Sequence, residues 1–121
     1  MAVLRSRHAL LLSQPRENHD LGSLTYVTSG GAPLAPSVRA EVERRIPTAR
    51  VCDGYGCTEV TSTATMNPPD ARRDGTVGVA LHGVRLRILG PAGDDLAAGV
   101  DGEVCVASAG VMAGYWRDPV A

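Results

Sequence analysis

The segment Asp53-Gly-Tyr-Gly-Cys-Thr-Glu59 carries the densest set of chemically useful side chains in this sequence. Glycines flank Tyr55, so its ring could lie flat against a planar base. Thr58 can donate a hydroxyl to a phosphate oxygen, and Glu59 can bind Mg²⁺, which takes one or two carboxylates together with phosphate oxygens. Each residue alone is compatible with a simpler interpretation: a core ring for Tyr55 and a solvated acid for Glu59. Together they predict a pocket for a planar base, a phosphate and a divalent metal.

A second glycine-rich loop, Ser29-Gly-Gly-Ala-Pro-Leu34, lies between a predicted strand and a predicted helix. Glycine lets a ligand approach the backbone closely, and N–H groups at the start of a helix bind anions. The loop lacks both the Gly-Lys-Ser/Thr of a Walker loop and the dinucleotide-binding fingerprint. A tight turn that binds no ligand is the alternative. We expect this loop to form the opposite wall of the pocket.

Both loops follow segments that predict strands of a parallel sheet. Residues 24–28 form a short β-branched and aromatic run. A helix is predicted to begin at Pro36 and to end at or just before Pro47, because apolar residues recur every four positions between them. Residues 50–52 predict the second strand and residues 53–56 its loop. This strand–loop–helix–strand–loop order is typical of a βαβ unit, and the carboxyl ends of such strands are where ligands bind.

The C-terminal part of the chain has a different sequence pattern. Residues 84–89 alternate between polar and apolar types, as in a half-exposed strand. Residues 91–95 predict a turn and residues 102–107 the returning strand. We therefore expect an α/β fold in which a parallel βαβ segment, residues 1–66, precedes an antiparallel β-hairpin or barrel segment, residues 67–121.

Composition excludes several classes of function. The 121 residues suit one domain, and the net charge of −1, with 12 arginines and no lysine, gives no electrostatic basis for binding nucleic acid or an anionic membrane. Residues 2–13 predict an amphipathic helix, too short in its apolar run for a signal peptide or a membrane span. Three cysteines are too few for a disulfide framework, so we expect reduced thiols and a cytoplasmic protein.

Three segments together resemble consecutive motifs of the adenylate-forming (AMP-binding) enzymes, which include acyl-CoA synthetases, peptide-synthetase adenylation domains and luciferases. They are Ser29-Gly-Gly-Ala-Pro-Leu34, Gly54-Tyr-Gly-Cys-Thr-Glu59, and Gly102-Glu-Val through Gly114-Tyr-Trp. The hexapeptide at 54–59 is the most specific of the three. The resemblance covers the chain from about residue 21 onward and implies the middle of the large N-terminal domain of such an enzyme.

The resemblance implies an acid-activating ligase. This family uses ATP and Mg²⁺ to convert a carboxylic acid to an acyl-adenylate, releasing pyrophosphate. It then transfers the acyl group, commonly to the thiol of coenzyme A. The implied partners are therefore a small carboxylic acid, ATP or AMP, and coenzyme A. The Gly114-Tyr-Trp ending is common in ligases of fatty and aromatic acids.

The resemblance also assigns residues to an adenine pocket. The turn at 31–33 flanks one face of the ring and Tyr55 the other, while Asp53 stands where the family often has a polar residue near the adenine amino group. The residues implied at this pocket are Gly31, Ala32, Pro33, Asp53, Gly54, Tyr55 and Gly56.

Two further assignments concern the phosphate and the acid. Thr58 matches the threonine at the α-phosphate and Glu59 the Mg²⁺ ligand, which makes them the implied catalytic residues. Gly30, Cys57 and Val60 fall where the acyl group usually passes. Cys57 replaces the methionine or leucine common there, so the resemblance implies an altered acyl pocket.

Family members are several times longer, and the lysine-bearing phosphate loop, the ribose-binding aspartate and the small C-terminal domain have no counterpart here. We therefore expect a fragment that is inactive by itself. Three alternatives stay open: a carrier-protein-loading adenylation domain, a non-catalytic remnant that binds nucleotide weakly, and a generic phosphate-binding α/β domain. Residues 102–116 are interpreted as structural, a strand and tight turn.

Overall fold

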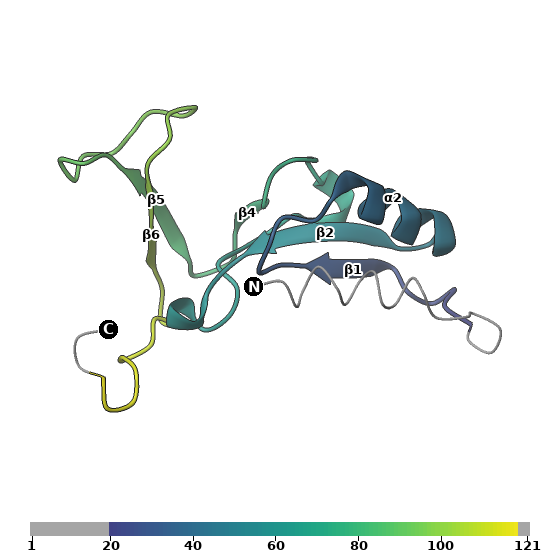
Figure 1. Cartoon of the computed structure of the whole chain (residues 1–121), viewed down its shortest axis with the longest axis horizontal. Helices are drawn as coiled ribbons and strands as arrows, with labels where there is room; N and C mark the ends of the chain where they lie inside the picture. Colours follow the sequence, from purple (N-terminus) through teal and green to yellow (C-terminus); the bar gives the residue numbers. More distant parts are fainter. Residues whose placement is uncertain (1–19, 119–121) are drawn as a thin grey trace. The chain divides into compact units, whose positions relative to one another are not determined.

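The computed structural model describes residues 20–118 of the chain (Figure 1). The helix predicted over residues 2–13 lies outside the described residues. The chain divides into two units, which are interleaved along the sequence: unit 1 comprises Met1–Tyr55 and Thr65–Val79, and unit 2 comprises Gly56–Ala64 and Ala80–Ala121. The functional division at residue 66 stays a prediction.

Unit 1 contains the predicted strand–helix–strand. Strand β1, Tyr26–Ser29, pairs in parallel with strand β2, Arg50–Tyr55, and helix α2, Pro36–Arg45, connects them. The helix begins at a proline because the first helical position needs no N–H donor. Its last turn carries two arginines, which interact favourably with the negative end of the helix dipole. The parallel βαβ segment is confirmed.

The core of unit 1 is built from small side chains. Val42 of α2 and Val51 and Cys52 of β2 are at most 6% exposed, and Ala49 between the two elements is fully buried. The sequence has no phenylalanine, and none of its tyrosines or its tryptophan is buried. Close packing of small aliphatic groups therefore supplies the contact between helix and strand.

Strand β2 is longer than the sequence predicts. Residues 53–55 were expected in a loop, but Gly54 and Tyr55 pair with the antiparallel strand β3, Thr65–Met66, while Asp53 pairs with β1. These pairings satisfy backbone groups that a loop would leave to water, and they override the low strand propensity of glycine. Only the prediction of a loop over 53–55 was wrong. The sheet has the order β1-β2-β3-β4, with β4 at Val79–Ala80.

The loop after β3 contains one buried polar side chain. Asn67 is only 1% exposed. Its amide donates to the Asp53 carbonyl at 2.8 Å, and its side chain accepts from the Arg73 amide at 3.1 Å and donates to the Thr76 carbonyl at 2.6 Å. A short 3₁₀ turn, η2, follows at Pro69–Ala71. A buried amide side chain thus organises a loop whose other residues are mostly exposed.

Unit 2 contains the predicted antiparallel hairpin. Strand β5, Arg85–Leu89, pairs with strand β6, Glu103–Ala107, so that residue 85 stands opposite 107 and residue 89 opposite 103. The predicted turn is present: the Gly90 amide donates to the Asp94 carbonyl at 2.9 Å. A 3₁₀ turn, η1 at Thr58–Val60, belongs to the same unit. The hairpin is confirmed.

All three cysteines are free, Cys52 buried and Cys57 and Cys105 half-buried; their reduced state stays a prediction. Among residues 20–118, no helix has the length and apolar character needed to cross a bilayer.

Candidate functional site

The carboxyl ends of β1 and β2 bring the two glycine-rich motifs of unit 1 side by side. The parallel pairing ends with Ser29 opposite Asp53. A Cβ built on Gly30 would lie 3.4 Å from the Gly54 carbonyl oxygen, so the two backbones are in contact here. Gly31 has a φ of 79°, a conformation that costs glycine little. We call residues 30–33 and 53–55 the strand-end cluster. It contains the residues of unit 1 that the resemblance assigns to the adenine pocket. It also contains Gly30, which the resemblance assigns to the acyl pocket.

Backbone pairing holds the last residues of β2 rigidly. A Cβ on Gly54 would meet the Thr65 carbonyl at 2.7 Å, so no side chain fits. The Tyr55 amide donates to Thr65 Oγ1 at 3.2 Å, and that hydroxyl donates to the Val77 carbonyl at 2.7 Å. Tyr55 is half-buried. Its backbone is therefore fixed by two neighbouring segments, while stacking of its ring on a base stays a prediction.

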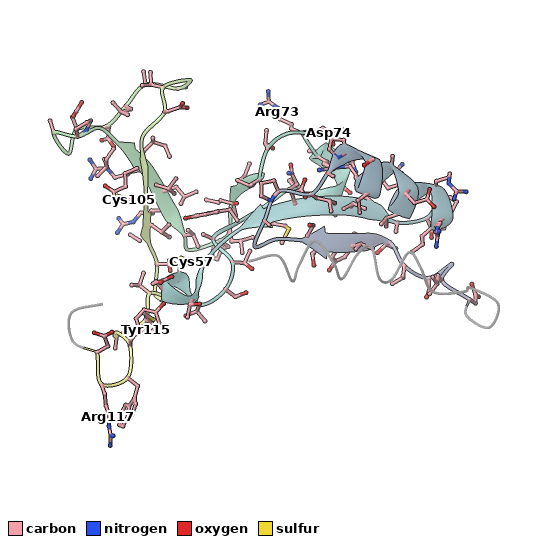
Figure 2. All side chains as sticks on the ribbon, viewed as in Figure 1. Cys57, Arg73, Asp74, Cys105, Tyr115 and Arg117 are labelled. Atoms are coloured by element: carbon pink, nitrogen blue, oxygen red, sulfur yellow. The ribbon has the colours of Figure 1, made fainter. Side chains whose placement is uncertain are left out.

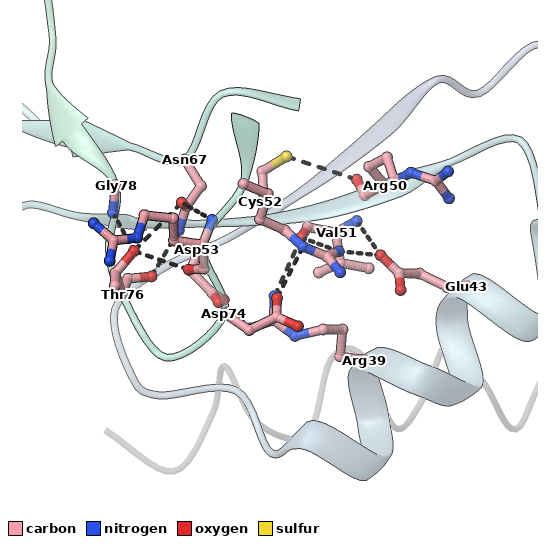
Figure 3. A network of polar contacts seen from close by, with 12 residues as sticks. Arg39, Glu43, Arg50, Val51, Cys52, Asp53, Asn67, Asp74, Thr76 and Gly78 are labelled. Atoms are coloured by element: carbon pink, nitrogen blue, oxygen red, sulfur yellow. Dashed lines mark hydrogen bonds and ion pairs between the residues drawn. The ribbon is translucent and has the colours of Figure 1, made fainter. Parts of the chain in front are cut away.

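A buried arginine in the helix holds the side chain of Asp53 (Figure 3). Arg39 is 9% exposed; one guanidinium nitrogen forms an ion pair with Asp53, and the other donates to Asp74 Oδ1 at 3.2 Å and to the Val51 carbonyl at 3.4 Å. Asp53, whose carboxylate the resemblance assigns to the adenine amino group, is thus paired with the Arg39 guanidinium at the end of β2.

A second arginine joins the same network. Arg72 forms an ion pair with Glu43, donates to the Val51 carbonyl at 3.1 Å and pairs with Asp74 at 2.9 Å. The hydrogen bond that Arg72 donates to Glu43 raises the pKa of Arg72. Burial alone would raise the pKa of Glu43, but hydrogen bonds from the Val51 amide and Arg72 outweigh it, and the pKa is lowered.

Sequence reasoning missed this network. The local signal for it is the position of Arg39. This charged residue directly follows Val38 and lies three residues before the buried Val42. A charged residue there is compatible with a solvated helix face, so the pattern alone does not identify a buried ion pair.

The remaining predicted residues lie in unit 2, in a tight turn around η1. Gly56 precedes it with no room for a side chain, since a Cβ there would lie 1.8 Å from the Ser62 carbonyl oxygen. Thr61 and Ser62 close the turn with φ values of 55° and 82°. Thr58 and Glu59 are exposed and Cys57 and Val60 half-buried. We call residues 56–60 the η1 cluster.

Glu59 is held by Tyr115, which lies 56 residues away in the sequence and is labelled in Figure 2. The Tyr115 hydroxyl donates to Glu59 Oε1 at 2.6 Å, and the Met112 amide donates to the Glu59 carbonyl at 2.8 Å. Hydrogen bonds from Tyr115, from the amide of Glu59 itself and from the Cys57 thiol lower the pKa of Glu59 from 4.5 to about 2. The negative charge of Glu59 raises the pKa of Tyr115 in turn. Tyr115 belongs to the Gly-Tyr-Trp segment that the sequence interpreted as structural.

The two candidate carboxylates therefore differ in what they can bind. Asp53 is paired with an arginine, so its charge is already balanced. Among the residues that the structure describes, the groups that donate to Glu59 are neutral, so these hydrogen bonds do not balance the charge of its exposed carboxylate. Among the described residues, no three His, Cys, Asp or Glu side chains gather into a metal site.

Known proteins similar to this chain are acid-activating ligases. A 4-coumarate-CoA ligase of Narcissus pseudonarcissus is 33% identical over 87% of the chain, which spans 20% of that relative. A probable nonribosomal peptide synthetase of Salinispora arenicola is 36% identical over 87% of the chain, which spans 1% of that relative. The solved structure of an anthranilate CoA ligase in complex with anthranoyl-AMP matches with a TM-score of 0.78 and 27% identity, over 92% of this chain and 22% of that one.

These matches agree with the folds of the two units. The mixed sheet of β1 to β4 and the antiparallel hairpin of β5 and β6 correspond to parts of the N-terminal domain of adenylate-forming enzymes. The chain spans about a fifth of the length of the 4-coumarate-CoA ligase it matches. Since the family model for AMP-binding enzymes covers residues 2–116, the chain belongs to the AMP-binding enzyme family.

Proposed function

We propose that this chain supplies part of the nucleotide and metal site of an ATP-dependent ligase that activates a carboxylic acid. In the first step a carboxylate oxygen of the acid attacks the α-phosphorus of ATP, and the bond to pyrophosphate breaks. The products are an acyl-adenylate and pyrophosphate. The observation that carries the proposal is the exposed Glu59 carboxylate, which directly follows Thr58 and whose donors within residues 20–118 are neutral groups.

The strand-end cluster is proposed to bind the adenine. Residues 31–33 would lie against one face of the ring and Tyr55 against the other. Gly54 and Gly56 flank Tyr55, where the Thr65 and Ser62 carbonyls leave no room for a side chain. The contact between the Gly30 and Gly54 backbones supports this, because it brings the two motifs together within unit 1. Asp53, oriented by Arg39, would accept a hydrogen bond from the adenine amino group.

The η1 cluster is proposed to act on the phosphate. Thr58 would donate its hydroxyl to an α-phosphate oxygen, and Glu59 would hold Mg²⁺. When bound, the metal would neutralise charge that builds up on the phosphate oxygens as pyrophosphate leaves. The task of Thr58 is to orient the phosphate for in-line attack, which is largely a matter of position and electrostatics. Gly30, Cys57 and Val60 would contact the acyl group.

Coenzyme A is the acyl acceptor we propose. Its thiol would attack the acyl carbon of the adenylate, forming the thioester and releasing AMP. The 4-coumarate and anthranilate relatives are named as CoA ligases, which favours this acceptor. The similarity to a nonribosomal peptide synthetase supports a carrier-protein thiol as the second candidate. The free cysteines favour a cytoplasmic location for the protein.

The proposal is tested by titrating the chain with AMP and Mg²⁺ in a calorimeter. Stacking of a base on an aromatic ring contributes about 1–3 kcal/mol, so Tyr55→Ala should weaken AMP binding roughly 5- to 150-fold. Tyr26→Ala, a change at a 54% exposed tyrosine on β1, is the matched control and should bind as the parent does. Glu59→Gln should abolish the dependence on Mg²⁺.

The same preparations distinguish the remaining alternatives. We expect AMP binding without ATP–pyrophosphate exchange from this chain alone, and exchange would contradict the expectation of inactivity. If the parent, Tyr55→Ala and Tyr26→Ala bind AMP with the same affinity, the adenine site is refuted and a generic phosphate-binding domain is favoured. Absence of any AMP binding at millimolar concentration would also refute it.

A further inference from the structure

In unit 2, the segment from Ser108 to Tyr115 lies directly against the η1 cluster. The Met112 amide donates to the Glu59 carbonyl at 2.8 Å, and the Thr61 hydroxyl donates to the Gly110 carbonyl. A Cβ on Gly110 would lie 3.4 Å from the Val60 carbonyl oxygen, so the two backbones approach closely. These contacts fix the backbone of the 3₁₀ turn from outside.

Backbone contacts alone do not orient the Glu59 carboxylate. The side chain has several rotatable bonds and is exposed, so in water it would sample many rotamers. The Tyr115 hydroxyl donates a hydrogen bond to Oε1 of this carboxylate at 2.6 Å. The backbone of Tyr115 is held by a tight turn, in which the Asp118 amide donates to the Tyr115 carbonyl at 3.3 Å.

We propose that Tyr115 is a positioning residue, whose hydroxyl holds the Glu59 carboxylate in the orientation that binds a divalent cation. This rests on the proposed function of Glu59 as the metal ligand. A phenol suits the task because it donates one hydrogen bond and carries no positive charge, so it orients the carboxylate without neutralising it. An arginine in its place would compete with the metal, as Arg39 would at Asp53.

The expected effect of losing this hydrogen bond follows from metal sites in general. Outer-shell partners that orient a metal ligand typically contribute about 10- to 100-fold in metal affinity or activity. Tyr115→Phe removes the hydroxyl and keeps the ring. Because both side chains are exposed, the fold should be unaffected, whereas the cation affinity should fall by about that factor.

The experiment titrates the chain with Mn²⁺ in the presence of AMP and follows free Mn²⁺ by electron paramagnetic resonance. Tyr115→Phe should raise the dissociation constant of Mn²⁺ about 10-fold or more. Tyr26→Phe makes the same chemical change on an exposed strand of unit 1 and should leave it unchanged. Circular dichroism and urea unfolding check that all variants keep the parent fold.

A double-mutant cycle with Glu59→Gln separates positioning from a general structural effect. If Tyr115 acts through Glu59, Tyr115→Phe adds no further loss of Mn²⁺ affinity in the Glu59→Gln background. If Glu59→Gln weakens Mn²⁺ binding but Tyr115→Phe does not, or if the two losses are additive, the inference about Tyr115 is wrong while the proposed function stands. If Glu59→Gln itself leaves Mn²⁺ binding unchanged, the metal role in the proposed function is wrong.

Discussion

Replacing Arg39 by methionine tests whether the buried ion pair holds the end of β2. The side chains of Arg39 and Asp53 are 11% and 16% exposed. Removing one partner of a buried pair typically costs about 3–5 kcal/mol, because the other charge is left uncompensated. Since Asp74 is 68% exposed and stays hydrated, we expect the lower end of this range, about 3 kcal/mol.

Thermal unfolding followed by circular dichroism measures the loss. For a chain of this size each kcal/mol lowers the midpoint by about 3–5 °C, so Arg39→Met should melt about 10 °C lower. Arg87→Met is the matched control, because Arg87 also pairs with an aspartate, Asp95, but both side chains are more than half exposed. Its midpoint should stay unchanged within error, since exposed pairs are screened by water.

A third variant identifies the cause of the loss. If the unpaired Asp53 charge is responsible, adding Asp53→Asn to Arg39→Met should recover part of the lost stability. Equal midpoints for Arg39→Met and Arg87→Met would refute the assignment of Arg39 to a buried pair. A double variant less stable than Arg39→Met alone would show that packing, rather than charge, sets the cost.

Two further predictions concern a glycine and a carboxylate. Gly78 and Gly75 both have a φ near 80°. A Cβ built on Gly78 would lie 2.1 Å from the backbone of Met66, whereas a Cβ built on Gly75 would contact no other atom within 4 Å. Gly75→Ala should therefore cost about 1 kcal/mol in urea unfolding and Gly78→Ala clearly more; equal costs would contradict this. Hydrogen bonds from Arg44 and Arg45 lower the pKa of Glu41 from 4.5 to about 2. The stabilisation of the fold by these hydrogen bonds is therefore present above pH 4.5 and is lost as the pH falls toward 2. An NMR titration of the Glu41 carboxyl group should show a midpoint near 2, and a midpoint near 4.5 would contradict the prediction.

Local patterns in the sequence predicted the parts of the fold that depend on neighbouring residues. Pro36 marked the start of the helix, and the alternation over 84–89 identified β5, because both features follow from backbone geometry within a few residues. The extension of β2 to Tyr55 was not predictable in this way. It depends on β3, a two-residue strand too short to carry a periodic signal.

The candidate site likewise has parts that local sequence patterns predict and parts that depend on tertiary packing. Motif composition located Tyr55, Thr58 and Glu59, whose roles stay predictions. It did not reveal the partners that orient the acids, since Arg39 lies 14 residues from Asp53 and Tyr115 lies 56 residues from Glu59. Such contacts are set by tertiary packing, and a single sequence holds no record of which distant residues meet.

The hydroxyl of Thr65 has a consequence for how the end of β2 can move. It accepts from the Tyr55 amide and donates to the Val77 carbonyl, so one oxygen atom links three stretches of unit 1. Peeling Tyr55 away from β3 would break the first bond and leave the donor to Val77 free to rotate. Local opening at this edge is therefore a cooperative event that involves residues 55, 65 and 77 together rather than the fraying of a single strand end.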